Sequence, residues 1–397
     1  MKILHVTPHL GGGVGKAHAA IAAALPTDVQ QTFLLLEAPR DRRHADALLD
    51  GGTAVVIARD LDDVTRHTAA ADIVQFEFWN HPRLFECLAR ANFPALRSIF
   101  WSHISGLFRP LIPPGLLAAA DRFVFTTEAS LTLPGVGGAR VSVVNSGFGF
   151  ERPAPRPARE TPRIAYLGTV DPVKMHPGFF DAIDALEDDC QVSIWGAPSI
   201  RALAAALNMQ NAHRLRLRGQ TDQPQDALAQ ADIFFYPLNP EHYGTAENAL
   251  VEAMSLGLVP VVLDNPAEAA IVRHGETGLV ARSIEECPAL LRTLLHDKPL
   301  RERLSANAAA HIATTRTPAR SAEAFIALWR DMLAQAPRRP DFAAATGATP
   351  ADWFLATQGE AWSPSPAADI AAAKGTLSHF KQVFEGDASL ERLHATS

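Results

Sequence analysis

Polar and charged residues gather after an apolar run that ends at Tyr236. A loop rich in Pro and Gly carries Glu241, and a helical pattern then begins at Thr245, a residue type that caps helices. Counted from Thr245, Asn248 and Glu252 fall at i+3 and i+7, so they share one face of the expected helix. Glu252 stands among apolar residues, where burying a carboxylate is costly unless it is hydrogen-bonded. The vicinal hydroxyls of a ribose or another sugar would satisfy it, and pairing with a structural Arg or a backbone N–H is the alternative.

A glycine-rich segment follows the first apolar run of the chain. Gly12 and Gly13 allow a backbone to approach a ligand closely, and N–H groups at a helix start can receive an oxyanion. The pair Gly15-Lys16 suggests a phosphate-binding P-loop, but a leucine stands where the first glycine belongs and Ala17 lacks the hydroxyl that would hold Mg²⁺. A tight strand-to-helix turn without a ligand is the alternative.

Two further sites of interest follow expected strands of the first half. His103 comes directly after an apolar run and could hydrogen-bond a sugar hydroxyl, orient an acceptor or cap a backbone carbonyl. Glu77 and Trp79 belong to an aromatic cluster at residues 76–81. Aromatic faces suit pyranose rings and Glu77 could act as a base, so this cluster could line an acceptor site; core packing is the alternative.

Short apolar runs that alternate with helical patterns must position these residues, and this alternation is typical of parallel sheets with crossover helices. In the first half the candidate strands are Ile3–Val6, Thr32–Leu36, Ala54–Ile57, Ile73–Phe76, Ser98–Trp101, Phe123–Thr126 and Val141–Val144. In the second half they are Ile164–Leu167, Val192–Trp195, Leu215–Leu217, Ile233–Tyr236, Val259–Leu263 and Gly278–Ala281. The sequence therefore predicts an α/β protein with two Rossmann-like, doubly wound domains.

The expected boundaries follow from composition. Residues 1–150 form an N-terminal Rossmann-like domain, and the Pro- and Arg-rich segment Glu151–Arg159 is a linker, because it sustains neither a helix nor a central strand. Residues 160–317 form the second domain. Residues 318–397 are helices and a tail whose aromatic residues imply packing on the N-terminal domain or on a partner, as in a dimer or protein contact. Ligands of such sheets bind beyond the carboxyl ends of strands, so we expect a site in a cleft between the domains.

Composition excludes several classes of protein. Over 397 residues, 36 Lys and Arg against 43 Asp and Glu give a net charge of −7, so no overall field attracts nucleic acid. The three cysteines lie far apart, which excludes a disulfide scaffold or a CxxC metal site, and no other metal-ligand motif appears. We expect no metal and no cofactor. The first apolar run is too short for a signal peptide and no run of ~20 apolar residues follows, so we expect a cytoplasmic chain without a transmembrane segment.

The stretch after Tyr236 resembles the signature of the retaining glycosyltransferases of family 4, whose GT-B fold has two Rossmann-like domains facing a cleft. Glu252 and the residues after it match the second half of that signature, which implies that Glu252 holds the donor ribose. The first half departs from it, because Gly244 stands where the family has its first Glu. Counting from Pro237 favours Glu241 as the equivalent, with Glu247 as the competitor.

Other segments carry the same resemblance. Lys174 matches a basic residue that clamps the donor diphosphate, whereas Thr169 replaces the family's Arg. Losing that guanidinium removes a bidentate phosphate contact, so Arg218, His176 or backbone N–H groups compensate or activity is reduced. The remaining donor-side residues implied by the resemblance are Gly12, Gly13, Thr245, Asn248, Gly196, Gly219 and Gln220.

The resemblance implies transfer of a hexosyl-type group from a nucleoside diphosphate sugar, UDP by default, to a hydroxyl acceptor such as a glycan or lipid-linked saccharide, with retention of configuration and without a metal. Lys174 and the helix start at Thr245 would stabilise the leaving diphosphate. Glu241 and His103 would be the catalytic residues that hold the donor sugar, with Glu77 and Trp79 on the acceptor side. Two alternatives are a catalytically silent nucleotide-sugar-binding or scaffold subunit and a nucleotide-sugar epimerase with the GT-B fold.

Overall fold

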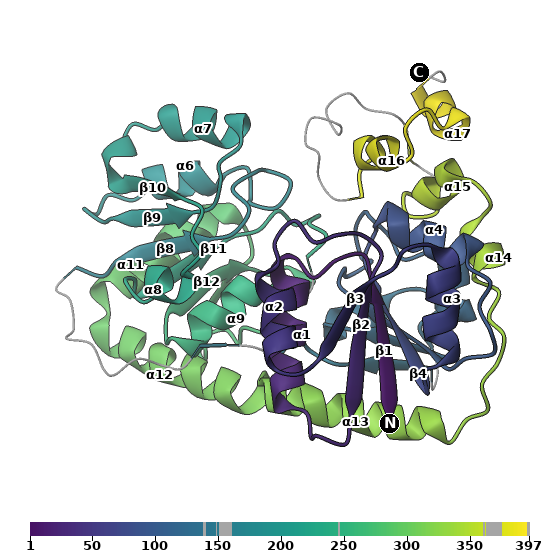
Figure 1. The fold of residues 1–397 in the computed structure, drawn as a ribbon. Coiled ribbons are helices and arrows are strands. Elements are labelled where there is room, and N and C mark those ends of the chain that lie inside the picture. The colour runs from purple at the N-terminus through teal and green to yellow at the C-terminus, as the bar shows by residue number, and fades with distance from the viewer. Residues whose placement is uncertain are drawn as a thin grey trace. The chain divides into compact units, whose positions relative to one another are not determined.

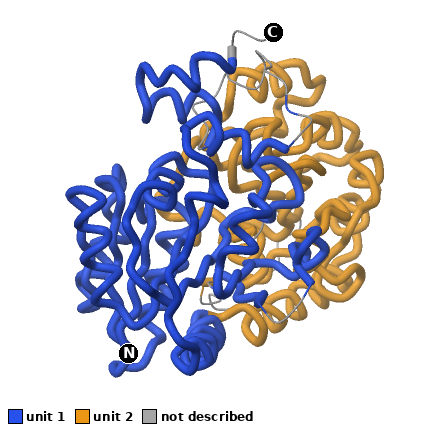
Figure 2. Tube along the Cα trace, turned by 90° about the vertical axis from the view of Figure 1, so that its right-hand side faces the viewer, with its two compact units in different colours: residues 1–147, 318–397 blue, residues 148–317 orange. Residues whose placement is uncertain are grey.

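The computed structural model (Figure 1) describes residues 1–137, 140–147, 149–150, 161–244, 247–359, 362 and 375–394. The chain forms two compact units (Figure 2). Unit 1 consists of Met1–Gly147 and Pro318–Ser397, and unit 2 consists of Phe148–Thr317. The predicted linker Glu151–Arg159 and the predicted cap Thr245 lie outside the described residues.

Unit 1 is built on a parallel sheet with the strand order β3-β2-β1-β4-β5-β6-β7 in its described residues. The strands are β1 (Lys2–Thr7), β2 (Gln30–Leu35), β3 (Ala54–Ile57), β4 (Ile73–Phe78), β5 (Ser98–Ser102), β6 (Arg122–Phe125) and β7 (Val141–Val143). Strand β1 pairs with both β2 and β4, so the direction of winding reverses between β1 and β4. In open parallel sheets this switch point is where ligands bind, beyond the carboxyl ends of the strands.

Unit 1 also contains helices, and some of them come from the C-terminal tail, where α15 and α16 pack on α4. They are α1 (Gly12–Ala24), α2 (Arg43–Asp50), α3 (Leu61–Ala69), α4 (Pro82–Arg90), α5 (Pro114–Ala119), α13 (Pro318–Leu333), α14 (Phe342–Thr346), α15 (Pro350–Leu355), α16 (Leu377–Val383) and α17 (Ala388–Glu391). Trp353 and Phe380 of the tail are fully buried in the core of unit 1, and the Arg90 guanidinium of α4 lies 5.0 Å from the ring centre of Trp353. Packing within its own chain therefore accounts for these aromatic residues of the tail.

Unit 2 has a second parallel sheet with the order β10-β9-β8-β11-β12-β13 in its described residues. Its strands are β8 (Ile164–Leu167), β9 (Val192–Trp195), β10 (Leu215–Gly219), β11 (Ile233–Tyr236), β12 (Val259–Leu263) and β13 (Leu279–Ala281). Its helices are α6 (Phe179–Asp184), α7 (Ile200–Leu207), α8 (Pro224–Leu228), α9 (Asn248–Ser255), α10 (Pro266–Ala269), α11 (Cys287–His296) and α12 (Lys298–Thr315). Each predicted strand of both units is present, with ends that differ by no more than two residues.

The start of α9 differs from the prediction. The helix begins at Asn248 and its N-cap residue is Glu247, which has the left-handed backbone angles φ 39° and ψ 54°. The predicted cap at Thr245 is therefore wrong for the helix start. A left-handed conformation costs a non-glycine residue of the order of 1–3 kcal/mol and persists only where the surroundings hold it. Here the surroundings are the buried partners of the Glu247 side chain.

Candidate functional site

Two loops at the carboxyl ends of neighbouring strands β8 and β11 are joined by hydrogen bonds. The Asn239 N–H donates to the Lys174 carbonyl at 2.7 Å, and the His176 N–H donates to the Pro237 carbonyl at 3.0 Å. The Asn239 side-chain amide also donates to the Pro172 carbonyl at 2.8 Å. These bonds hold the backbone of Lys174 against the loop that leads into α9.

Lys174 forms an ion pair with Glu247. Its Nζ lies 3.2 Å from Glu247 Oε2, and the Tyr236 hydroxyl donates to the same oxygen at 2.9 Å. Burial opposes ionisation of Glu247, but the positive charge of Lys174, the nearby His242 ring and the hydrogen bonds from Tyr236 and Lys174 outweigh it and hold the pKa of Glu247 below its ordinary value. Burial likewise acts against the charge of Lys174, yet Glu247 keeps the pKa of Lys174 above its ordinary value. The pair is therefore ionised at neutral pH.

His242 connects this ion pair to a second buried carboxylate, Glu268. The His242 Nε2 lies 3.0 Å from Glu268 Oε1, and its Nδ1 lies 3.8 Å from Glu247 Oε1. Burial raises the pKa of Glu268, and the nearby charge of Glu247 adds to this effect. Among the described residues, Glu247 Oε1 and Glu268 Oε2 have no hydrogen-bond partner. Neither His242 nor Glu268 is predicted from the sequence; the only signal is their place shortly after apolar strands, His242 in the loop after β11 and Glu268 in the short helix α10 after β12.

The side chains of His242, Glu247 and Glu268 come within 4.8 Å of one another, which is close enough to hold a metal ion. However, His242 Nδ1 accepts the Gly244 N–H at 2.9 Å, so the neutral ring carries its proton on Nε2, the nitrogen that faces Glu268. A protonated Nε2 has no lone pair for a cation. The chemistry of these donors does not favour a metal, and the absence of one from the reaction stays a prediction.

The other residues predicted for this region differ in how far they are buried. Glu252 is buried in α9, 5% exposed, and Asn248 is half-buried at the first position of that helix. Glu241 is exposed, and its N–H donates to the Asn239 side chain at 3.2 Å. The structure thus brings Glu247, not Glu241, to Lys174.

Glycines at the ends of β8, β9 and β10 approach one another closely. The Gly196 N–H donates to the Gly219 carbonyl at 2.8 Å. A Cβ on Gly196, whose φ is 143°, would lie 2.0 Å from the Gly168 carbonyl oxygen, so only glycine fits there. Thr169 and Gln220, which adjoin these glycines, are exposed.

In the glycine segment of unit 1, some glycines are exposed and one is required by close packing. Gly12 and Gly13 are exposed at the start of α1, and Gly12 has a φ of 62°. Gly15 is required by packing, because a Cβ there would lie 1.9 Å from the Leu10 carbonyl oxygen. The exposed pair therefore leaves backbone accessible at the helix start.

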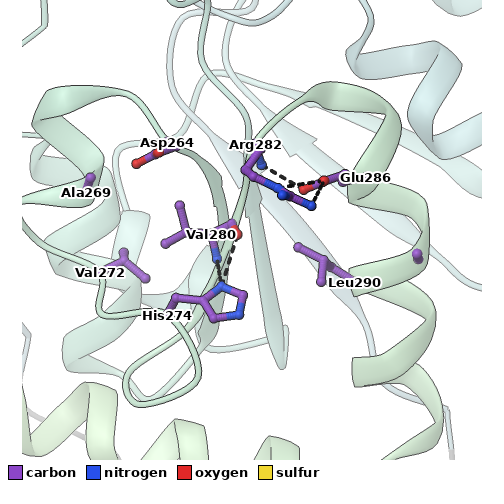
Figure 3. A pocket seen from close by; sticks show the side chains of 9 residues that line it. Asp264, Ala269, Val272, His274, Val280, Arg282, Glu286 and Leu290 are labelled. Carbon is purple, nitrogen blue, oxygen red and sulfur yellow. Dashed lines mark hydrogen bonds and ion pairs between the residues drawn. The ribbon is translucent and has the colours of Figure 1, made fainter.

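A cavity of about 740 Å³ lies beside β13 of unit 2 (Figure 3). His274 and Arg282 contribute to its wall; the first hydrogen-bonds the Val280 backbone and the second pairs with Glu286. None of the predicted site residues lines this cavity.

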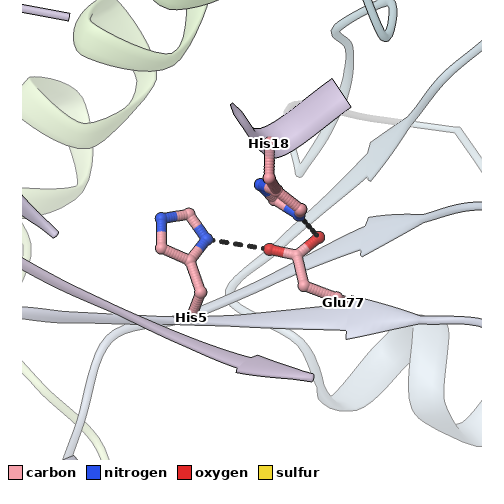
Figure 4. Close-up of side chains that lie close together, drawn as sticks. All are labelled: His5, His18 and Glu77. Atoms are coloured by element: carbon pink, nitrogen blue, oxygen red, sulfur yellow. Dashed lines mark hydrogen bonds and ion pairs between the residues drawn. The ribbon is translucent and has the colours of Figure 1, made fainter. Parts of the chain in front are cut away.

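Glu77 of β4 is fully buried in unit 1 and is surrounded by four polar side chains. His5 Nδ1 lies 2.9 Å and Gln75 Nε2 lies 3.0 Å from its Oε1. His18 Nε2 lies 3.0 Å and His103 Nε2 lies 2.9 Å from its Oε2. Figure 4 shows His5 and His18 approaching the carboxylate from different elements. The sequence predicts Glu77 and His103 separately but neither His5 nor His18, although a histidine within an apolar strand, such as His5, is itself a signal.

Charge in this cluster is concentrated on Glu77. Burial opposes its ionisation, but the nearby His18 ring and the hydrogen bonds from His103, His18 and His5 hold the pKa of Glu77 well below its ordinary value. Burial lowers the pKa values of His5 and His103. A neutral His103 that donates from Nε2 to Glu77 keeps its lone pair on Nδ1. Glu77 thus fixes the tautomer of His103 and is itself shielded from solvent.

We expect the Glu77 cluster to make unit 1 less stable in acid. The pKa of Glu77 is depressed by folding, so its contribution is present above its unfolded pKa of about 4.3 and is lost as the pH falls below it. The buried neutral His5 and His103 also have depressed pKa values. Their contribution is complete above about pH 6.5 and declines as the pH falls. The thermal midpoint of the protein should therefore be lower at pH 5.5 than at pH 7.5. The difference should be smaller for the variant His5→Gln. Equal midpoints of the unsubstituted protein at both pH values would contradict this account.

The fold is shared with solved structures of glycosyltransferases. A structure of Anabaena HepE with UDP-glucose has a TM-score of 0.67 at 16% identity, with 83% of this chain and 100% of HepE aligned. A glycosyltransferase from Rickettsia africae has a TM-score of 0.67 at 12% identity, with 84% and 99% aligned. These likenesses establish the fold: two Rossmann-like α/β units of the GT-B type.

Residues 148–311, which are nearly all of unit 2, match the family Glycosyl transferases group 1. A segment of 98 residues is 30% identical to the GDP-Man:Man(3)GlcNAc(2)-PP-Dol alpha-1,2-mannosyltransferase of Dictyostelium discoideum, and it makes up 24% of this chain and 19% of that relative. Unit 2 therefore contains a glycosyltransferase group 1 domain. No helix in the described part of the chain is long and apolar enough to cross a membrane.

Proposed function

We propose that the protein is a cytoplasmic, metal-independent retaining glycosyltransferase of family 4 that moves a hexosyl group from UDP-sugar to a hydroxyl acceptor. The observation that carries this proposal is the ion pair between the half-buried Lys174 and the buried Glu247, at 3.2 Å, at the carboxyl ends of the unit 2 strands. A lysine in this place can stabilise the negative charge that develops on the diphosphate as the glycosidic bond breaks. UDP is favoured as the nucleotide because HepE was solved with UDP and with UDP-glucose.

In this mechanism Glu247 replaces Glu241 as the functional carboxylate. Its side chain is fully buried and faces the same lysine, so we assign it the positioning of the Lys174 ammonium in place of direct contact with the donor sugar. Glu252 and Asn248 of α9 would hold the ribose. The exposed N–H groups at Gly12 and Gly13 would contact phosphate, and Gly196, Gly219 and Gln220 would border the base.

His103 would serve the acceptor. With its proton held on Nε2 by Glu77 at 2.9 Å, the ring offers Nδ1 as an acceptor for the proton of an incoming hydroxyl. Glu77 is fully buried, so we assign it the positioning of His103 in place of direct contact with the acceptor. The Glu77 carboxylate also sets the orientation of the His103 ring. Buried carboxylates commonly orient a histidine that acts as a base in this way.

A panel of nucleotide-sugars tests the proposal. We expect one UDP-sugar to raise the thermal midpoint, because a ligand that binds only the folded state stabilises it, and to release UDP when an acceptor is supplied. GDP-mannose is the comparison, since the similar Dictyostelium protein is named for GDP-Man.

The second candidate, a silent nucleotide-sugar-binding subunit, is favoured by one observation: Thr169 stands where the family has an Arg. A midpoint shift without release of nucleoside diphosphate would support that candidate and contradict ours. The epimerase alternative predicts conversion of the nucleotide-sugar itself without an acceptor.

A further inference from the structure

Three polar side chains that the proposed reaction does not use converge at the switch point of the unit 1 sheet. His9 follows β1, Glu37 follows β2 and His81 follows β4, and these strands are neighbours in the order β2-β1-β4. Their ligand atoms lie within 4.8 Å of one another, and His81 Nε2 lies 3.4 Å from Glu37 Oε1. They therefore occupy the place where open parallel sheets bind ligands.

The C-terminal tail adds a third histidine to this group. The ring of His379 in α16 lies edge-on to that of His81, with centroids 4.9 Å apart. The segment before α16 is held closely, because the Asn80 side-chain amide donates to the Gly375 carbonyl at 2.8 Å. A Cβ on Gly375 would lie 2.4 Å from the Asn80 carbonyl oxygen. The tail is thus fastened to the loop after β4.

The hydrogen bonds of these histidines determine what they can bind. Each Nδ1 accepts a backbone N–H: that of Gly11 for His9 at 3.0 Å, that of Arg83 for His81 at 3.2 Å and that of Gly375 for His379 at 3.0 Å. A neutral imidazole that accepts at Nδ1 carries its proton on Nε2. Metal ligation through Nε2 needs a lone pair there, usually with Nδ1–H donating to an oxygen. The three rings are therefore N–H donors and poor metal ligands.

Trp79 provides an independent sign that a ligand belongs here. It is 7% exposed, and its ring centre lies 5.4 Å from that of His9, 6.0 Å from that of His81 and 5.9 Å from that of His103. Its Nε1–H has no hydrogen-bond partner among the described residues. A buried indole N–H normally finds an acceptor, and leaving it unpaired is costly. A bound molecule with an acceptor oxygen would remove that cost.

The site combines N–H donors with one carboxylate, that of Glu37. This combination indicates which class of ligand fits. A cation would pair with Glu37 and leave the Trp79 N–H unsatisfied, whereas an anion would satisfy the N–H and face the charge of Glu37. A hydroxyl group accepts from an N–H and donates to a carboxylate at once. Several such groups side by side occur on a sugar ring.

We propose that the switch point of unit 1 is a subsite for an uncharged saccharide, which binds through the Trp79 N–H, the imidazole N–H groups and the Glu37 carboxylate. The tail contributes His379 to this subsite. The proposal rests on the proposed function, because it identifies the acceptor of the transfer as a sugar hydroxyl. It places that acceptor beside the His103 ring, which Trp79 also contacts.

Indole N–H signals in nuclear magnetic resonance test the subsite without any turnover. The chain has six tryptophans, and Trp79→Phe identifies the Trp79 signal by its loss while keeping an aromatic ring. In the unsubstituted full-length protein, we expect methyl glucosides, methyl mannosides or short neutral oligosaccharides to move the Trp79 signal downfield. Inorganic phosphate and Zn²⁺ added alone should leave it in place.

Two further variants sharpen the test. Glu37→Gln and His379→Gln should each weaken saccharide binding roughly 5- to 10-fold, as the loss of one hydrogen bond does. His213→Gln, at an exposed position of unit 2, is the matched control and should bind as the unsubstituted protein does. The proposal is overturned if no neutral saccharide moves the Trp79 signal or if phosphate or Zn²⁺ moves it instead. Failure of the proposed function would appear separately, as no nucleoside diphosphate release from any donor.

Discussion

Glu247→Gln is expected to lower the rate of sugar transfer roughly 100-fold or more, which is the usual effect of removing a group that stabilises charge in a transition state. The glutamine amide cannot balance Lys174, and it replaces the carboxylate that accepts the Tyr236 hydroxyl at 2.9 Å. Glu241→Gln, a neighbouring change of the same chemistry at an exposed position, should alter the rate by less than about twofold. The measurement is the initial rate of nucleoside diphosphate release at saturating donor and acceptor.

This pair of variants separates the two assignments left open by the family signature. Circular dichroism and thermal midpoints of both variants establish that each is folded. If Glu241→Gln loses activity while Glu247→Gln keeps it, the carboxylate chosen by counting from Pro237 is the functional one, and our assignment of Glu247 is wrong.

Lys174→Met should lower kcat/KM for the donor by roughly 1000-fold, because it removes a positive charge from the leaving diphosphate. It should also reduce the free energy of unfolding by about 3 kcal/mol, since it leaves the buried Glu247 without a counter-charge. The two effects have different origins. Donor titrations and urea unfolding measure them independently.

Two companion variants distinguish these origins. Lys174→Arg retains the charge and should keep a larger share of both activity and stability. Lys174→Met combined with Glu247→Gln removes both charges, so we expect stability to recover while activity stays low; the coupling between the two changes is measured by a double-mutant cycle. Full activity in Lys174→Met would exclude the diphosphate role of this lysine.

The tertiary structure changes the role assigned to several residues that the sequence presents only one by one. Glu77 was predicted as a base that meets the acceptor, yet it is enclosed by His5 of β1, His18 of α1 and His103, which directly follows β5. Convergence of this kind depends on which strands are neighbours. Strands β1, β4 and β5 are far apart in sequence and adjacent in the sheet.

The tail illustrates the same distinction. Its aromatic residues predicted that part of the tail is buried, but composition did not reveal which surface it packs against. The structure buries Trp353 and Phe380 in unit 1 and brings His379 to His81, across about three hundred residues of sequence.

The amino-acid sequence by itself determined the strands and the order of the two α/β series, because apolar periodicity along the chain is a local property. Only the tertiary structure decided that Glu247 is the partner of Lys174 and that α9 begins at Asn248. The reason is that a buried ion pair can hold Glu247 in a left-handed conformation that its own residue type disfavours, and no local pattern encodes a contact made across 73 residues.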